Sequence, residues 1–374
     1  MPKGVPPMSS PITPARCFAA SNSAEGFRNY YDELFTDTCP DFLYIIKGGP
    51  GTGKSHFMKK ISLHARERGY DVIEYLCSSD PYSLDGILLT ADGKPSLGFL
   101  DGTAPHGRDA SLPGVREELI DLGRFWQGSR LRQRRDEIAS LCAAKAGEYA
   151  AAYRYLKAAG ETEGVMDALL APCLRKDALS ALGERILRDQ PEGKGFHAVP
   201  ALRRAISMRG AMTLPSFEKA ALEAGGRLVV LQDHPTREGG GVAACLMEIL
   251  LTVSRRKELL TYVSYDPLIP RKINGLYYPA TGLCILAGHA ETAETLPTRH
   301  ISLRRYLDTA PLRAARPELR RAMTLRRNLL EAAEARLKSA ATHHFALEEI
   351  YAEAMDFREK EMFTDTFCRE AFGE

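Results

Sequence analysis

Residues 48–55 read GGPGTGKS, a glycine-rich run that ends in a lysine and a hydroxyl group. Glycine reaches backbone conformations that side chains forbid, so successive N–H groups of such a loop can turn inward around an anion. Lys54 would bring a positive charge to phosphate oxygens, and Ser55 would offer its hydroxyl to Mg²⁺. The pattern predicts a loop that binds ATP with Mg²⁺. The expected contacts are Gly48, Gly49, Pro50, Gly51, Thr52, Gly53, Lys54, Ser55 and His56.

The segments on either side of the loop are of the kind that such a loop needs. Phe42–Lys47 reads FLYIIK, which is typical of a strand buried on both faces, and residues 54–68 place apolar side chains at helical spacing. The N-terminus of that helix would add its partial positive charge to the phosphate site. Further strands are expected at 72–76, 86–89 and 97–100. This alternation predicts an α/β fold built on a parallel sheet.

Asp101 directly follows the last of these strands, and it is the candidate for a second acid that holds Mg²⁺ together with Ser55. No glutamate comes after it, because residues 102–105 read GTAP. Fast hydrolases often place a carboxylate there to orient water. We therefore expect slow turnover, or a general base that lies elsewhere in the chain.

Four more polar residues should lie at the same edge of the sheet, where the ligands of open α/β sheets bind. They are Asp80 and Asp85 in CSSDPYSLDG, and Thr103 and His106 in the segment after Asp101. For each one alone, a role in a turn or a helix cap fits as well as catalysis, and Asp80 before a proline is a natural turn initiator. The candidate catalytic residues are Lys54, Asp101 and Asp80.

The second half of the chain repeats the first. SSDP at 78–81 matches SYDP at 264–267, and LGFLDGTA at 97–104 matches LCILAGHA at 283–290, both at a separation of 186 residues. Arg227–Gln232, RLVVLQ, stands where the FLYIIK strand belongs. Because one separation serves two distinct segments, we predict two homologous α/β halves, both P-loop NTPase-like.

The second half lacks the groups that would hold phosphate and metal. At the separation of 186 residues, Gly240 stands for Lys54, Gly241 for Ser55 and Ala287 for Asp101. The loop at 233–241, DHPTREGGG, is therefore predicted to bind no nucleotide. We expect this half to have a structural or regulatory role.

Helical segments follow each half. From about Ser129 the chain is rich in Ala, Arg, Glu and Leu at helical spacing, and a break at Gly160 before a second helical stretch at 165–188 predicts an antiparallel hairpin. Residues 319–357 have the same character. The predicted organisation is a flexible tail at 1–14, an active domain at 15–128, a hairpin at 129–189, a linker at 190–200, a degenerate domain at 201–315 and a hairpin at 316–374.

Composition and charge restrict the class of partner. The 374 residues carry 50 Lys and Arg against 48 Asp and Glu, a formal net charge of +2 that argues against a dedicated nucleic-acid-binding role. The eight cysteines lie far apart without a C-x-x-C pair, as in a reduced cytosolic protein. Glu248 interrupts the longest apolar run, 242–253, and the N-terminal residues lack the apolar core of a signal peptide. We expect a cytoplasmic protein that does not bind membranes.

Three blocks of the first half, YIIKGGPGTGKSHFMKKI, CSSDPYSLDG and FLDGTAPH, resemble a family of uncharacterised bacterial proteins. Members of that family are described as ATPases or nucleotide-kinase-like, and they carry two tandem P-loop halves. Through the repeat, the resemblance covers most of the chain, and it implies two P-loop folds in tandem. In that family both halves usually keep the loop, so this chain departs from the pattern in its second half. The family has no established substrate.

Several functions are compatible with these residues. The leading one is slow, Mg²⁺-dependent hydrolysis of ATP, in which the nucleotide state alters the helical hairpins and hence a protein partner. The alternative is a small-molecule or nucleotide kinase, with Asp80 or Asp85 as the base toward an acceptor. AAA-type and helicase motors share GGPGTGKS, but this chain lacks an Asp-Glu pair after the strand at 97–100. In a last interpretation, ATP is a structural ligand only.

Overall fold

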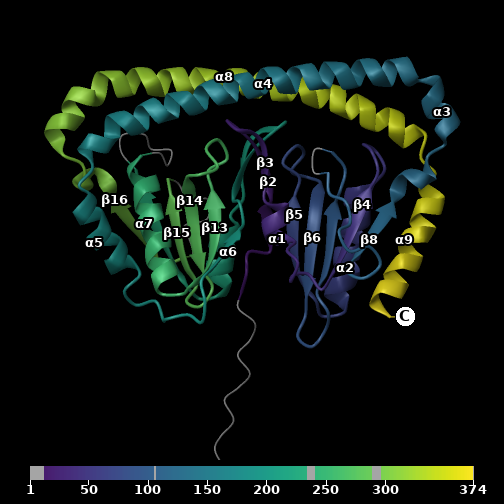
Figure 1. The fold of residues 1–374 in the computed structure, drawn as a ribbon, viewed down its shortest axis with the longest axis horizontal. Coiled ribbons are helices and arrows are strands. Elements are labelled where there is room, and N and C mark those ends of the chain that lie inside the picture. The colour runs from purple at the N-terminus through teal and green to yellow at the C-terminus, as the bar shows by residue number, and fades with distance from the viewer. Residues whose placement is uncertain (1–11, 105–106, 234–240, 289–295, 374) are drawn as a thin grey trace, which may run out of the picture.

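The computed structural model describes residues 12–104, 107–233, 241–288 and 296–373. Within these residues, two six-stranded sheets lie next to each other, and two long helices run across both of them (Figure 1). Of the predicted tail at 1–14, residues 1–11 lie outside the described part of the chain.

The first sheet contains the strand that precedes the glycine-rich loop. Its order is β1 (Arg16–Phe18), β5 (Asp71–Leu76), β6 (Leu84–Thr90), β7 (Leu97–Asp101), β4 (Phe42–Lys47) and β8 (Glu117–Asp121). Strand β4 has the predicted bounds and runs parallel to both neighbours. Leu43, Ile45 and Ile46 are fully buried, as expected of an interior strand with covered faces. The helix after the loop, α2 (Lys54–Glu67), is also as predicted.

This sheet is mixed, so the prediction of a parallel sheet is wrong. Strand β6 runs antiparallel to both β5 and β7. The physical reason is the length of the connections, since only residues 77–83 and 91–96 join these strands. A parallel neighbour needs a crossover of a dozen or more residues, whereas short connections produce hairpins.

The second sheet repeats the topology of the first. Its order is β9 (His197–Pro200), β13 (Leu260–Tyr265), β14 (Ile273–Tyr278), β15 (Leu283–Ala287), β12 (Arg227–Gln232) and β16 (Thr298–Ser302). Strand β14 is antiparallel to both neighbours, as β6 is. Helix α7 (Val242–Arg256) follows β12 as α2 follows β4. The two sheets therefore share one strand order, in agreement with the predicted repeat of two α/β halves.

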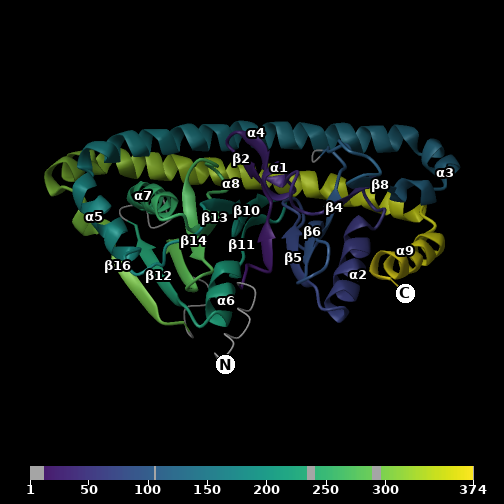
Figure 2. The ribbon, with the colours of Figure 1, turned by 60° about the horizontal axis from the view of Figure 1, so that its bottom comes forward.

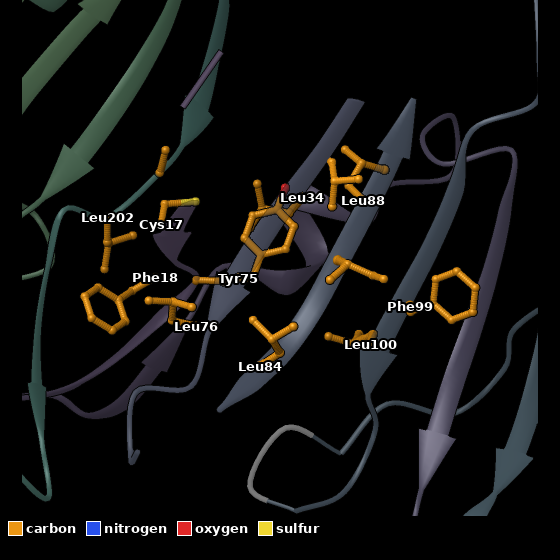
Figure 3. Close-up of a cluster of buried hydrophobic side chains, with 14 of the residues drawn as sticks. Cys17, Phe18, Leu34, Tyr75, Leu76, Leu84, Leu88, Phe99, Leu100 and Leu202 are labelled. Carbon is orange, nitrogen blue, oxygen red and sulfur yellow. The ribbon is translucent and has the colours of Figure 1, made fainter. Parts of the chain in front are cut away.

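The two halves share a buried core. The backbone N–H groups of Phe18 and Leu202 donate to each other's carbonyl oxygens, at 2.8 and 3.0 Å. Figure 3 shows Leu202 near Phe18 and Cys17, at one end of a cluster that continues through Tyr75 to Phe99. The smaller elements are η1 (Leu122–Phe125), η3 (Leu303–Tyr306), α1 (Tyr31–Leu34), α6 (Ser216–Glu223), the hairpin of β2 (Ala20–Ser23) and β3 (Gly26–Asn29), and the hairpin of β10 (Arg204–Ser207) and β11 (Gly210–Thr213).

The first half ends in α3 (Gly128–Gln133), α4 (Arg135–Leu170), η2 (Ala171–Cys173) and α5 (Lys176–Ile186). Helix α4 continues through Gly160, so the predicted break there is wrong. A Cβ built on Gly160 would lie 2.5 Å from the Cβ of Ala24. This glycine therefore allows α4 to pack closely on the turn between β2 and β3. The helix ends instead at η2, which contains Pro172.

Helices α4 and α5 do not form the predicted hairpin. Helix α4 packs along α8 (Thr309–Glu353) of the second half, and the two run in opposite directions across the sheets (Figures 1 and 2). Helix α5 packs on α7 of the second half, and the C-terminal helix α9 (Phe357–Phe372) packs on α2 of the first. Each half therefore contributes its last helix to the other half.

Reciprocal hydrogen bonds hold this exchange in place. The N–H of Gln127 donates to the carbonyl oxygen of Ala354 at 2.7 Å, and the N–H of Asp308 donates to that of Cys173 at 2.8 Å. The two donors are 181 residues apart, and so are the two acceptors. A symmetric dimer would make such paired contacts between equivalent positions, and here both partners belong to one chain.

The separation between equivalent residues changes along the chain. In the connections β5–β6 and β13–β14, Cys77 and Asp266 donate the equivalent backbone bond, at 2.9 and 2.8 Å, which gives a separation of 189 residues. The predicted match of SSDP with SYDP is therefore displaced by three residues, and Asp80 is equivalent to Ile269. The separation of 186 residues holds for β7 and β15, which pair with β4 and β12 in the same way.

Candidate phosphate-binding site

Residues 48–53 join β4 to α2, and the path of this loop requires its glycines. The φ angles of Gly48, Gly51 and Gly53 are +148°, +71° and +77°, values that other residues rarely adopt. In the described part of the chain, the N–H groups of Gly51, Gly53, Lys54 and Ser55 donate no hydrogen bond. Free amides before and within the first turn of a helix are the donors that bind phosphate groups.

The Lys54 side chain is folded back over this loop. Its Nζ donates to the carbonyl oxygens of Gly48 at 2.7 Å and Gly49 at 2.9 Å. The same nitrogen lies 3.6 Å from Oδ2 of Asp101, and both side chains are largely buried. The loop thus holds the ammonium group of Lys54 against its own backbone.

Asp101 lies at the end of β7, beside the end of β4, because the register pairs it with Ile46. Its Oδ1 accepts the N–H of Thr103 at 2.8 Å. The hydroxyl of Thr103 in turn donates to the carbonyl oxygen of Gly48 at 2.7 Å. The structure therefore brings the predicted residues Lys54, Asp101 and Thr103 together at one edge of the sheet.

The other predicted contacts of the loop differ in their surroundings. The Ser55 hydroxyl accepts the N–H of Leu84 at 3.0 Å and keeps its own proton to donate. The Thr52 hydroxyl donates to the carbonyl oxygen of Gly49 at 2.9 Å and braces the loop. The exposed ring of His56 lies 3.7 Å from the carboxylate of Glu361, on α9.

The protein groups at this loop fit Mg²⁺ only if a bound nucleotide supplies further oxygen ligands. Within the described ranges, no group of three or more His, Cys, Asp or Glu side chains is placed to hold a metal ion. The predicted ligands are one hydroxyl, of Ser55, and one carboxylate, of Asp101. Magnesium typically takes one or two protein oxygens and completes its shell with water and phosphate oxygens. These two residues would therefore hold Mg²⁺ together with a nucleotide.

Asp80 and Asp85 are engaged in structural contacts. Oδ1 of Asp80 accepts a hydrogen bond from Nε of Arg209 at 2.6 Å, and this arginine belongs to the turn between β10 and β11 of the second half. Asp85 is buried and accepts the hydroxyl proton of Tyr31 at 3.1 Å. Asp80, predicted as catalytic, thus links the two halves. The predicted His106 lies outside the described residues.

Elements from distant parts of the chain lie directly against the loop. A Cβ built on Gly51 would lie 2.5 Å from the carbonyl oxygen of Glu348 and 3.0 Å from the backbone nitrogen of Ala352, both near the end of α8. A Cβ on Gly49 would lie 3.3 Å from the ring of Trp126. Sequence reasoning missed these neighbours, because the end of α8 is about 300 residues from the loop and carries no motif.

The loop between β12 and α7 has nine residues, three more than its counterpart. Residues 234–240, which include Gly240, lie outside the described part of the chain. Gly241 precedes α7 with a positive φ, as Gly53 precedes α2. On this alignment Val242 stands for Lys54, Ala243 for Ser55 and Ala287 for Asp101, and all three are buried. The alignment with Gly240 and Gly241 is corrected, while the predicted loss of the lysine, the hydroxyl and the acid holds.

A scan against models of protein families, and searches of curated proteins and of solved structures, find no match for this chain. None of the described helices is both long enough and apolar enough to cross a membrane.

Proposed function

We propose that the chain binds ATP together with Mg²⁺ at the loop Gly48–Ser55, and that the second half binds no nucleotide. One observation carries this proposal: a loop whose amides before and at the start of α2 donate no hydrogen bond also holds the ammonium group of Lys54, which lies 3.6 Å from the carboxylate of Asp101. Amides, a lysine, a hydroxyl and an acid are the groups that P-loop sites use.

Each residue has a role that follows from its present contacts. Lys54 would exchange the carbonyl oxygens of Gly48 and Gly49 for phosphate oxygens, since an ammonium group is attracted more strongly to an anionic oxygen than to a neutral carbonyl oxygen. Asp101 and Ser55 would hold Mg²⁺, which neutralises charge on the phosphates when bound. Thr103 would keep Asp101 aligned with the loop.

The reaction that this arrangement favours is slow hydrolysis of ATP. Residues 102–105, directly after Asp101, contain no second carboxylate to orient water, and Thr103 already bonds to the loop. Because the end of α8 touches the loop at Gly51, a change of nucleotide state would act directly on α8 and on the helix after it. We infer that nucleotide binding is coupled to these helices and, through them, to a protein partner.

The kinase alternative has less support. It requires Asp80 or Asp85 as a base toward an acceptor, yet Asp80 is paired with Arg209 and Asp85 is buried against Tyr31. A general base needs a carboxylate oxygen within hydrogen-bond reach of the acceptor, and these contacts already engage both carboxylates.

The test is a calorimetric titration of the full chain with Mg-ATP, followed by turnover assays. We expect one nucleotide per chain and slow release of phosphate, with no new phosphorylated product when a cell metabolite extract is added. Absence of ATP binding would end the proposal, and an extract-dependent phosphorylated product would establish the kinase instead.

A further inference from the structure

Lys360, in the first turn of α9, is a buried cation that the predicted site does not include. Its side chain is only 2% exposed, and the nearest carboxylate oxygen, of Glu361, lies 3.8 Å away. Glu361 also pairs closely with Lys60 and lies near His56, so Lys360 shares a carboxylate that is already occupied. Burial lowers the pKa of Lys360 below the ordinary value for lysine, because the charged form is desolvated.

The ammonium group of Lys360 lies against the phosphate-binding loop. A Cβ built on Gly53 would be 3.3 Å from Nζ and 3.5 Å from Cε of Lys360. Gly53 immediately precedes Lys54, and its N–H is one of the free amides described above. A second lysine therefore approaches the loop, from helix α9 of the second half, whereas Lys54 belongs to α2 of the first half.

The second half provides an internal comparison. Because α5 packs on α7 as α9 packs on α2, the residue 181 positions before Lys360 is its equivalent, Leu179. Leu179 is fully buried, in the apolar cluster that also contains Leu170 and Val242. A leucine is thus sufficient to pack the exchanged helix where the loop has no Lys54. A lysine at this position incurs a desolvation cost that packing alone does not require.

We propose that Lys360 is a phosphate-binding residue of the nucleotide site, supplied by the helix that the second half contributes to the first. This assignment rests on the proposed binding of ATP at the same loop. The assignment adds one consequence to the proposed function: an anion bound between the loop and Lys360 would hold α9 against α2. Nucleotide binding would then stabilise the exchange of helices between the halves.

Two substitutions at position 360 test the assignment, with one matched control. Lys360→Leu copies Leu179, and Lys360→Met keeps the length of the side chain if the branched residue impairs folding. Lys60→Met is the control, because Lys60 lies in the same α2–α9 interface but pairs with Glu361 and Asp365. The measurements are the Kd of Mg-ATP by calorimetry and the unfolding temperature of each variant without nucleotide.

We expect both variants of Lys360 to weaken the binding of Mg-ATP by about tenfold or more, because each variant loses one hydrogen bond between charged groups. The unfolding temperature should stay the same or rise, since no charge has to be desolvated. The control should lower the unfolding temperature slightly and change the Kd less than about twofold. A purely structural lysine would give the reverse, a lower unfolding temperature with an unchanged Kd, and that result would overturn the assignment.

Hydrogen exchange supplies a second readout that does not depend on turnover. In the wild type, Mg-ATP should slow amide exchange over residues 357–372, and in Lys360→Leu this protection should be lost. A wild type that fails to bind ATP would refute the proposed function itself. A wild type that binds, together with Lys360 variants that bind equally well, would refute the role of Lys360 alone.

Discussion

The loop between β4 and α2 and the loop between β12 and α7 lie at the same place in the same topology, yet their surroundings have opposite character. Around the first lie Lys54, Asp101 and Lys360; at the equivalent positions around the second lie Val242, Ala287 and Leu179. The strands that support the loops differ little, since Leu43 and Ile45 of β4 and Leu228 and Val230 of β12 are all buried. The sheet and the site therefore depend on different residues.

Gly241 before α7 and Gly51 before α2 each lie against the end of one of the two long helices, α4 and α8. A Cβ on Gly241 would lie 2.6 Å from Cδ1 of Leu170, at the end of α4. In the first half the equivalent of Leu170 is Tyr351, 181 residues later, and its Cβ would lie 3.2 Å from a Cβ on Gly51. The start of α7 thus lies among apolar side chains and gains burial energy, while the start of α2 lies among charged groups at a cost in stability.

The largest effect is expected when a charge is placed in the apolar site. Leu179→Lys would bury an ammonium group without a carboxylate partner, which should lower the free energy of unfolding by about 3–5 kcal/mol. Leu179→Met, which conserves volume, should cost less than about 1.5 kcal/mol. Chemical denaturation measures both. Equal stability of the two variants would mean that the second loop is not an apolar site.

Lys54→Ala should weaken the binding of Mg-ATP by at least about tenfold, because Lys54 brings a full positive charge onto the loop itself. Lys59→Ala is the control, since Lys59 lies on the same helix but is exposed and bonds to the carbonyl oxygen of Tyr82. Calorimetry decides the result. An unchanged Kd for Lys54→Ala would remove the phosphate-loop interpretation.

Asp101→Asn should weaken the binding of ATP only when Mg²⁺ is present. Because Asp101 is assigned to Mg²⁺ and not to the phosphates, metal-free binding of ATP should stay largely intact. The gain in affinity with rising Mg²⁺ should shrink, and turnover should fall. Titrations at several concentrations of Mg²⁺ test this. If the variant matches the wild type at every concentration, Asp101 serves only to pair with Lys54 and Thr103.

Local sequence patterns predicted the elements whose residues are neighbours in the chain. The bounds of β4 and β12, the start of α2 and the loop between β4 and α2 all follow from apolar runs and from glycines that the turn requires. The antiparallel strands β6 and β14 could have been inferred from their short connections. The prediction of a parallel sheet was based on the alternation of strands and helices and did not take these lengths into account.

Long-range features were not predictable in the same way. Nothing in the composition of α5 or α9 says which half each helix covers, and Lys360 has no motif that links it to a loop 300 residues earlier. Gly160 was misinterpreted as a helix breaker, because only the contact with Ala24 reveals why a glycine is needed there. The match at Asp80 also failed, because the loop before α7 is longer than the loop before α2, and the connection β14–β15 is shorter than β6–β7, so one separation does not serve the whole repeat.

The smallest effect is expected at Asp80, whose predicted catalytic role rested on its place after a strand at the ligand-binding edge of the sheet. Its partner Arg209 also lies over the rings of Tyr82, at 5.0 Å, and Phe345, at 5.2 Å, so the arginine keeps favourable contacts without the carboxylate. The pair is partly exposed, and such pairs contribute about 0.2–1 kcal/mol. Asp80→Ala should therefore lower the free energy of unfolding by that amount and leave ATP binding and turnover unchanged. Denaturation curves and turnover assays measure the two quantities independently. A variant with native stability but no turnover would place Asp80 in the reaction and restore the kinase alternative.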